Sequence, residues 1–563
     1  MLLLLSACGR DAPLQPESGR RLPPRPPARV VNPLCTGSGQ VHPGDTLTAS
    51  VTWPASGNPH QVTSTVVVQP GATLTIEPGA VLCFGAGAGL RSNGGRLFAR
   101  GQAAAPIVFT AYDTAQGWIG IDLQGTPSLG SQIRHARVEY VDTGHVAITS
   151  TGHLVFVDTS VVRQSGAGVW LWGRSSRLGW SRVDTTTNAA LSAVELGDSA
   201  RFQSSVIQSA AGVGMLIDGM TDVRLVGSGN RVEGSGDVGI RVTPMAVIGS
   251  DGSSRATVTG GQSYPIEASI SQFQRLYTST ASNQDHLKGN ARDTVVMLGG
   301  TLNASLYVRT GLPWHVKGSI VVDSGGVLAG QARSLIVMDS ALLIAAQSGG
   351  RLQLRGTRAS PLVVTAADPA HGWRGIVLFG APDTPSSIAN ARVEHVDPLW
   401  TAVTALDSHA VKIDSVVLRQ VGRAVSLLSP GSRLTRSRVD TTLSASSPAV
   451  ELGADAILES TLIRGSAGYG VAIQSASVQV QSCDIRGSAS GGIYMFVAAP
   501  VHNCNLSNYA NVGVWNFDTA TADVTGTWWG DPGGPTAPGA DYAYGPLTYT
   551  PWRTTPYVLP YVP

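Results

Sequence analysis

Three short phrases near the end of the chain decide the fold: STLIRGS at 460–466, SCDIRGS at 482–488 and NCNLSN at 503–508. Similar phrases begin at Ser415 and Ser437, so successive phrases are spaced by 22, 23, 22 and 21 residues. Apolar and polar residues alternate within them, which is the period of a β-strand. A unit of about 22 residues therefore holds three short strands, each stacking on its counterpart in the next unit.

A larger repeat of about 255 residues encloses the small one. Its matching phrases are GWIGI at 117–121 and GWRGI at 372–376, ARVE at 136–139 and 391–394, SRVDTT at 181–186 and 437–442, and VELG at 194–197 and 450–453. Long self-similarity of this kind is typical of repeat architectures. We expect a feature present in both copies to be structural, whereas a functional site can occur in only one.

The composition agrees with a narrow, all-β repeat. The chain has 67 glycines, only 9 phenylalanines and 13% charged residues, and narrow coils favour small or β-branched inward side chains. It lacks both an apolar run of about 20 residues for a membrane helix and the helix–strand alternation of an α/β barrel. The sequence therefore predicts an all-β solenoid, a parallel β-helix with on the order of 22 turns and a length of about 100 Å.

Further phrases resemble those of a known family. VVVQPGATLTIEPGAVL at 66–82, PIVFTA at 106–111 and WWGDPGGP at 528–535 are similar to segments of bacterial secreted right-handed parallel β-helix proteins, in the pectin-lyase-like superfamily. The resemblance covers nearly everything from Cys35 onward and implies a right-handed coil. It does not specify a function, because this fold hosts lyases, hydrolases, esterases and adhesins.

The N-terminus indicates export. MLLLLSAC at 1–8 resembles a bacterial lipobox with Cys8 as the lipid-bearing residue, although a basic segment is missing and the apolar run is very short. Residues 9–34 are rich in proline and arginine and predict an extended tether. We expect a lipoprotein of the bacterial outer membrane or cell surface, or otherwise an extracellular protein, that meets the membrane only through its anchor. A net charge of only +2 gives no reason to expect a nucleic-acid partner.

The chain divides into six predicted segments. These are a lipoprotein-type signal (1–8), a tether (9–34), a first β-helix copy (35–250), an irregular transition (251–318), a second copy (319–526) and a C-terminal cap and tail (527–563). The copies stack either as one rod or as two abutted rods. The sequence does not set the oligomeric state.

In an exported protein the cysteines carry information. Cys35 opens the folded region and Cys83 lies in an early strand, so we predict a disulfide between them. Cys483 and Cys504 occupy the same place in consecutive coils, with Cα atoms about 5 Å apart, which suits either a disulfide or two stacked thiols. No metal site is predicted, because ligand spacings are missing. No cofactor is predicted either, and nothing supports calcium.

Catalytic candidates are few. The catalytic phrases of polygalacturonase-like proteins are absent, and the densest ionisable group of the chain includes Lys288, Arg292 and Asp293. This group could support a β-elimination, but a solvated loop with local ion pairs is the favoured interpretation. The charged residues that recur in both copies, such as Glu139 and Glu394, are expected to form ion pairs between neighbouring coils.

One aromatic feature occurs in a single copy. Strand alternation places Trp170 and Trp172 outward, where the second copy has Ser426 and Leu428. Exposed indole rings are costly and suit the apolar faces of sugars, so they predict a glycan platform unless a loop covers them. Tyr494 and Trp515 take comparable outward positions in later coils and are weaker candidates for the same role.

Three functions follow as alternatives. The leading one is a lipid-anchored or secreted protein that binds a polysaccharide or another surface partner without catalysis. The second is a polysaccharide lyase or glycoside hydrolase whose site is assembled from several coils. The third is a passive structural or adhesive rod.

Overall fold

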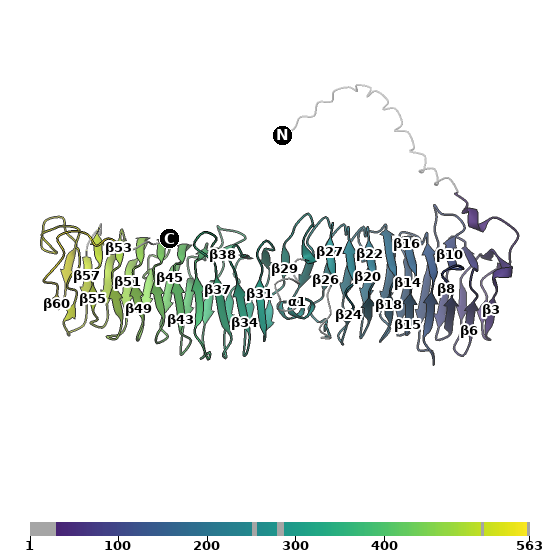
Figure 1. Ribbon diagram of the computed structural model, residues 1–563, viewed down its shortest axis with the longest axis horizontal. Helices are drawn as coiled ribbons and strands as arrows, with labels where there is room; N and C mark the ends of the chain where they lie inside the picture. Colours follow the sequence, from purple (N-terminus) through teal and green to yellow (C-terminus); the bar gives the residue numbers. More distant parts are fainter. Residues whose placement is uncertain (1–29, 250–255, 278–285, 508–511, 560–563) are drawn as a thin grey trace, which may run out of the picture.

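The protein is a single straight rod of stacked coils (Figure 1). The computed structural model describes residues 30–249, 256–277, 286–507 and 512–559. The rod is a parallel β-solenoid of about 20 turns with a spacing of about 24 residues, so the predicted fold is confirmed with slightly longer coils than expected. Cys8 and the signal segment 1–8 lie outside the described residues, as does most of the tether.

One sheet, which we name the long sheet, runs through nearly the whole rod. It contains β2 (Thr46–Leu47), β5 (Val66–Val68), β8 (Leu90–Asn93), β11 (Ile121–Gln124), β14 (Val146–Thr151), β17 (Ala167–Leu171), β20 (Val194–Leu196), β23 (Met215–Ile217), β26 (Ile240–Val242), β28 (Ile266–Ala268), β29 (Val295–Met297), β32 (Trp314–Val316), β35 (Leu335–Met338), β38 (Leu362–Ala366), β41 (Ala391–Glu394), β44 (Val417–Val421), β47 (Arg438–Thr442), β50 (Leu462–Ser466), β53 (Asp484–Arg486) and β56 (Asn505–Ser507). Its continuity joins both copies into one rod.

Two sheets flank the long sheet in the N-terminal half. Sheet N1 contains β1 (Val41–His42), β4 (His60–Val62), β7 (Val81–Phe84), β10 (Ile107–Ala111), β13 (Ala136–Glu139), β16 (Val161–Ser165), β19 (Arg182–Thr186), β22 (Val206–Gln208), β25 (Arg231–Glu233) and β27 (Thr257–Thr259). Sheet N2 contains β3 (Val51–Trp53), β6 (Thr73–Ile76), β9 (Arg96–Arg100), β12 (Ser131–Arg134), β15 (Val155–Asp158), β18 (Arg177–Gly179), β21 (Arg201–Gln203) and β24 (Arg224–Val226). Each coil there passes from N1 to the long sheet and then to N2.

Two other sheets flank it in the C-terminal half. Sheet C1 contains β30 (Gly300–Leu302), β33 (Ile320–Val322), β36 (Ile344–Ala346), β39 (Ile376–Leu378), β42 (Thr401–Ala405), β45 (Arg423–Leu427), β48 (Val450–Leu452), β51 (Tyr469–Ile473), β54 (Gly491–Met495), β57 (Val512–Asn516) and β59 (Tyr542–Tyr544). Sheet C2 contains β31 (Ser305–Val308), β34 (Val327–Gly330), β37 (Arg351–Arg355), β40 (Ser386–Ala389), β43 (Val411–Asp414), β46 (Arg433–Thr435), β49 (Ile457–Glu459), β52 (Gln479–Gln481) and β55 (Val501–His502). The short strands β58 (Ala522–Asp523) and β60 (Leu547–Thr548) pair at the C-terminal end.

The two copies of the large repeat are offset by one face of the rod. The ARVE phrase forms β13 of sheet N1 in the first copy but β41 of the long sheet in the second. The GWxGI phrase likewise leads into β11 of the long sheet and into β39 of sheet C1. Equivalent residues of the two copies therefore belong to different faces, and a surface feature of one copy is not continued by its counterpart in the other.

A short helix lies at the junction of the copies, inside the segment predicted to be irregular. Helix α1 (Ile270–Leu276) begins after β28 with a capping box in which Ser269 and Gln272 exchange hydrogen bonds. The Gln272 side chain also donates to the oxygens of Thr243 and Ala246 in the preceding coil, at 2.7 and 2.8 Å. The Ile270 amide donates to Gly299 in the following coil. The helix therefore replaces one strand without breaking the stack.

The core is a column of inward side chains along the whole rod. Strand residues alternate between buried and more exposed positions, as in β5, β6 and β38, because successive side chains of a strand face opposite sides. At the N-terminal end the predicted disulfide between Cys35 and Cys83 is present, with a Cα–Cα distance of 5.7 Å. Cys483 and Cys504, whose pairing the sequence left open, are buried free thiols on consecutive coils. Near the C-terminal end, Trp529 of the predicted cap is fully buried.

Candidate functional site

The duplicated GWxGI phrase has a structural role in both copies. Trp118 and Trp373 are fully buried, and their indole nitrogens donate to the backbone oxygens of Glu139 and Glu394 at 2.9 and 3.0 Å. The glycine two residues further on has φ +90° in the first copy and +84° in the second. A Cβ there would lie 2.2 Å or less from a backbone oxygen of the next coil, so only glycine fits. The phrase therefore builds the coil and is not a site.

The repeated acidic residues are held by ion pairs, as predicted. Glu139 is 1% exposed and its carboxylate lies 2.7 Å from Arg163 of the neighbouring coil and 3.0 Å from Arg137. In the second copy Glu394 lies 3.1 Å from Arg419, which is also on the next coil. A carboxylate buried to this degree needs such a partner, because removal of the arginine would leave an uncompensated buried charge.

Each copy also buries a serine–histidine pair, which the sequence analysis did not find. Ser131 Oγ lies 2.7 Å from His153 Nε2, and Ser386 Oγ lies 2.8 Å from His409 Nε2. All four residues are fully buried, and burial lowers the pKa of both histidines. A nucleophile must reach its substrate, so two enclosed pairs in equivalent places serve packing and hydrogen bonding.

The predicted catalytic group lies on the turn that precedes β29. Both carboxylate oxygens of Asp293 accept backbone hydrogen bonds, from Gly289 at 3.0 Å and Asn290 at 2.8 Å. Arg292 donates to the hydroxyl of Tyr264 at 3.0 Å and lies over its ring. The ammonium group of Lys288 lies beside Gly311. Local contacts thus account for Arg292 and Asp293.

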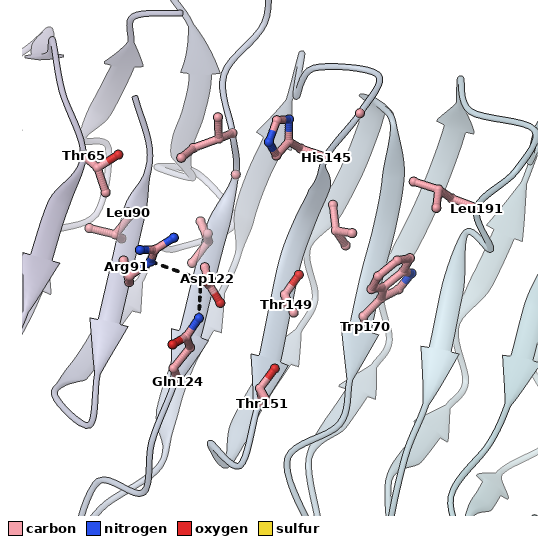
Figure 2. Close-up of a pocket in the computed structure, with 15 residues that line it drawn as sticks. Thr65, Leu90, Arg91, Asp122, Gln124, His145, Thr149, Thr151, Trp170 and Leu191 are labelled. Atoms are coloured by element: carbon pink, nitrogen blue, oxygen red, sulfur yellow. Dashed lines mark hydrogen bonds and ion pairs between the residues drawn. The ribbon is translucent and has the colours of Figure 1, made fainter. Parts of the chain in front are cut away.

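A groove occurs on the long sheet of the first copy (Figure 2). Strand pairing aligns four outward residues on consecutive coils: Arg91 in β8, Asp122 in β11, Thr149 in β14 and Trp170 in β17. Neighbouring strands are about 4.8 Å apart, so the row spans about 14 Å along the rod. The groove has a volume of about 380 Å³. Its length and openness suit an extended chain better than a compact molecule.

The floor of the groove is polar at one end. Asp122 accepts from Arg91 Nε at 3.1 Å and from the amide of Gln124 at 2.7 Å (Figure 2). Both charged side chains are partly exposed, 46% for Arg91 and 29% for Asp122. Thr149 and Thr151 add hydroxyl groups to the floor, so the groove offers donors and acceptors in a row.

An indole ring closes the other end. Trp170 is half-buried, lines the groove and is fixed by a hydrogen bond from its indole nitrogen to Ser192 O at 3.1 Å. Trp172 follows β17, is 41% exposed and has its ring centroid 5.2 Å from that of Trp170. The two outward tryptophans predicted from the sequence therefore lie together, and only Trp170 is among the residues that line the groove.

A buried carboxyl group supports the tryptophans. Glu195 pairs in register with Trp170 and accepts a hydrogen bond from Ser192 Oγ at 2.6 Å. Burial raises the pKa of Glu195 above its ordinary value, although hydrogen bonds from Ser192 and Trp172 oppose the shift. This carboxyl group positions the loop and the indole rings.

The second copy keeps the strands but not the groove residues. Its equivalent row is Ala345 in β36, Val377 in β39, Thr404 in β42 and Ser426 in β45, joined by the same parallel pairing. The ionic pair and the indole ring are replaced by small or apolar side chains. The groove residues therefore occur in one copy, as expected of a functional site.

The weaker aromatic candidates are placed elsewhere. Tyr494 in β54 and Trp515 in β57 belong to sheet C1, near the opposite end of the rod from Trp170 (Figure 1). They cannot contribute to the groove. The sequence analysis missed Arg91, Asp122 and Gln124, although a comparison of the two copies position by position would have shown that the second copy lacks them.

Comparisons with known proteins add no assignment. No protein-family model matches the chain, and no curated protein matches it. Among the described residues, no group of three or more histidine, cysteine, aspartate or glutamate side chains could hold a metal ion. None of the helices in the described part is long and apolar enough to cross a membrane.

Proposed function

We propose that this protein is an exported β-solenoid that binds a soluble polysaccharide chain in the groove of its first copy, without catalysis. The observation that carries the proposal is the row Arg91, Asp122, Thr149 and Trp170, in which an indole ring and a polar floor lie along one groove in a single copy. Aromatic rings stack on the apolar faces of sugars, while charged and amide groups bind their hydroxyls. Anchoring through Cys8 and membership of the pectin-lyase-like superfamily belong to this proposal.

The separation of carboxyl groups favours binding over hydrolysis. Glycoside hydrolases place two carboxyl groups roughly 5–10 Å apart across the scissile bond. Asp122 is the one carboxyl group among the residues that line the groove, and the next carboxyl group along the paired strands, Glu195 of β20, is three strand spacings away, about 14 Å. Asp122 is also engaged by Arg91 and Gln124. The row therefore offers contacts along a polysaccharide chain but lacks the pair of carboxyl groups that glycoside hydrolysis needs.

The test measures binding to a panel of soluble polysaccharides by affinity electrophoresis and calorimetry. We expect Trp170→Ala to weaken binding about tenfold, since losing an aromatic contact costs about 1–2 kcal/mol. The matched control is Trp180→Ala, which removes an indole that is 51% exposed but lies outside the groove. Unchanged binding by Trp170→Ala, or equal weakening by both variants, contradicts the proposal.

The bound polysaccharides are then incubated with the protein and assayed for unsaturated products and new reducing ends. We expect neither to form. Unsaturated ends would identify a lyase, and saturated reducing ends a hydrolase, so either product would replace the binding role by an enzymatic one.

A further inference from the structure

Six aromatic side chains gather on sheet C1 in the last coils. Strands β51 and β57 of these coils lie toward the opposite end of the rod from β14, a strand of the groove (Figure 1). This aromatic face consists of Tyr469, Tyr494, Phe496, Trp515, Phe517 and Tyr544. They come from β51, β54, β57 and β59 or from the residues directly after those strands. The face therefore crosses four consecutive strands and follows the axis of the rod.

The rings form one connected array. Tyr494 lies at its centre, with ring centroids 4.8 Å from Tyr469, 4.7 Å from Phe496 and 4.4 Å from Phe517. Phe517 in turn stacks on Trp515 at 4.4 Å with an interplanar angle of 19°. Mutual contact holds the rings in fixed positions, so little side-chain freedom is lost when a ligand binds.

The array is open to solvent. Phe496 is 50% exposed, Phe517 47% and Tyr544 60%. Earlier strands of the same sheet carry small or polar residues in the row that Tyr494 and Trp515 continue, namely Thr404, Ser426, Glu451 and Ala472. A contiguous exposed apolar patch marks a binding surface.

The size of the face argues against a second copy of the chain as its occupant. An aromatic side chain offers about 200 Å²; about half of Phe496, Phe517 and Tyr544 is exposed and less of the other three, so the face presents at most roughly 600 Å². A stable protein interface needs about 800 Å² on each partner. A flat ligand that covers only the rings is a better fit.

Polar groups continue the face in the direction of the N-terminus. Glu451 accepts from Ser426 at 2.7 Å and from the side chain of Gln474 at 3.3 Å, and it pairs in register with Ala472, the neighbour of Tyr494. Arg423 also forms an ion pair with this carboxylate. Rings followed by a row of hydrogen-bonding groups match a sugar chain, which presents apolar ring faces and hydroxyls along its length.

We infer that the aromatic face is a second binding site, which takes the flat surface of a neutral, extended polysaccharide. The coil rise of about 4.8 Å is close to the length of one sugar unit in an extended β-linked chain, so successive strands meet successive sugars. The groove takes a single soluble chain, whereas the flat face takes packed chains. The inference does not depend on the groove, because the two sites share no residue.

The experiment measures depletion of the full-length protein by cellulose and chitin powders. We expect the wild-type protein to bind at least one powder and the double variant Phe496→Ala/Phe517→Ala to bind at least tenfold more weakly. Trp170→Ala, which affects only the groove, and Leu428→Ala, which removes an exposed apolar side chain of the same sheet, serve as controls and are expected to bind normally. Circular dichroism and the thermal midpoint verify folding, and Tyr544→Ala replaces the double variant if the latter is unstable.

Three outcomes overturn the inference. The first is a failure of the wild-type protein to bind either powder. The second is normal binding by both Phe496→Ala/Phe517→Ala and Tyr544→Ala. The third is a concentration-dependent dimer in sedimentation velocity that the same substitutions abolish, which would make a second copy the occupant. If one of these outcomes is found while Trp170→Ala still weakens binding of soluble chains, this inference fails and the proposed groove function stands.

Discussion

The groove of the first copy and its counterpart in the second share their backbone but not their surface. Strands β8, β11, β14 and β17 pair in the same pattern as β36, β39, β42 and β45. Inward residues such as Ile121 and Ile376 are equally buried, whereas the outward Trp170 is replaced by Ser426. The two copies thus keep the inward residues that pack the core of each coil, whereas their outward residues differ. The difference shows which outward side chains are specific to the first copy, and these are the ones to which we assign the proposed binding.

The two copies also differ in the sheet to which their equivalent strands belong. The groove lies on the long sheet, and its counterpart lies on sheet C1, the sheet that carries the aromatic face further along. The rod therefore presents a polar groove and an aromatic face on different sides and at different ends. The two proposed sites lie on different sheets and would therefore not compete for one ligand surface.

The largest expected effect tests whether the shared residues are structural. Trp118→Ala and Trp373→Ala each remove a fully buried indole and its hydrogen bond to the next coil. We expect each substitution to lower the free energy of unfolding by about 3–5 kcal/mol. Urea denaturation followed by circular dichroism measures the loss. A large effect at Trp118 with almost none at Trp373 would mean that the second copy does not use the shared phrase for packing.

The next largest effect, the loss of stability on removing the disulfide, should be confined to the first copy. The disulfide between Cys35 and Cys83 closes a separation of 48 residues in the first coils, and Val337 of β35 takes the equivalent position to Cys83. Replacing both cysteines by alanine should cost about 2–4 kcal/mol. Hydrogen exchange should accelerate in β1 to β9 and stay unchanged in β29 to β37. Equal acceleration in both regions would show that the rod unfolds as a single unit.

Much of this architecture could be predicted from the sequence, because strand alternation and the two repeat periods are local signals. They gave the all-β solenoid and the outward positions of Trp170 and Trp172, whereas the Cys35–Cys83 disulfide was predicted from the positions of two cysteines in a chain expected to be exported. The offset between the copies could not be predicted, because coil length varies: Ile121 pairs with Ile148 27 residues later, and Ile148 with Val169 only 21 later. The groove could not be predicted either, because its residues are distant in the sequence and meet only through the register of the coils.

Arg91 and Asp122 illustrate that reason. They are 31 residues apart in the chain and meet only because coils of unequal length stack in a particular register. No linear motif contains both residues. The same holds for the aromatic face, of which only Tyr494 and Trp515 were recognised, since Phe496, Phe517 and Tyr544 join them through turns and the C-terminal strand.

A smaller effect concerns affinity in the groove. Arg91→Ala should weaken binding of the soluble polysaccharide about tenfold, because a hydrogen bond to a charged group contributes about 1.5 kcal/mol or more. The counterpart of Arg91 in the second copy is already an alanine, Ala345, so the control there is Ser426→Ala, at the position equivalent to Trp170, which should change the dissociation constant less than about twofold. Calorimetry with the best soluble ligand measures both. Weakening by Ser426→Ala would mean that the two copies bind the ligand together.

A pH dependence of stability also separates the two copies. His42 in β1 stacks on Trp53 at 3.9 Å and lies 3.1 Å from His60 of β4, where the second copy has Trp314 in β32. Burial, followed by the charge of His60, lowers the pKa of His42 to about 4, while Asp45 opposes the shift; burial also lowers the pKa of His60.

The sign follows from proton binding. Between about pH 6.5 and 4 the unfolded chain protonates His42 and the folded chain does not, so stability present above pH 6.5 is lost as the pH falls through this range. We expect the urea midpoint to fall between pH 7 and pH 5, and His42→Gln to make that fall shallower because Gln does not titrate. Trp314→Phe, the control in the second copy, should leave the slope unchanged. An equally steep fall in His42→Gln would place the acid sensitivity elsewhere in the rod.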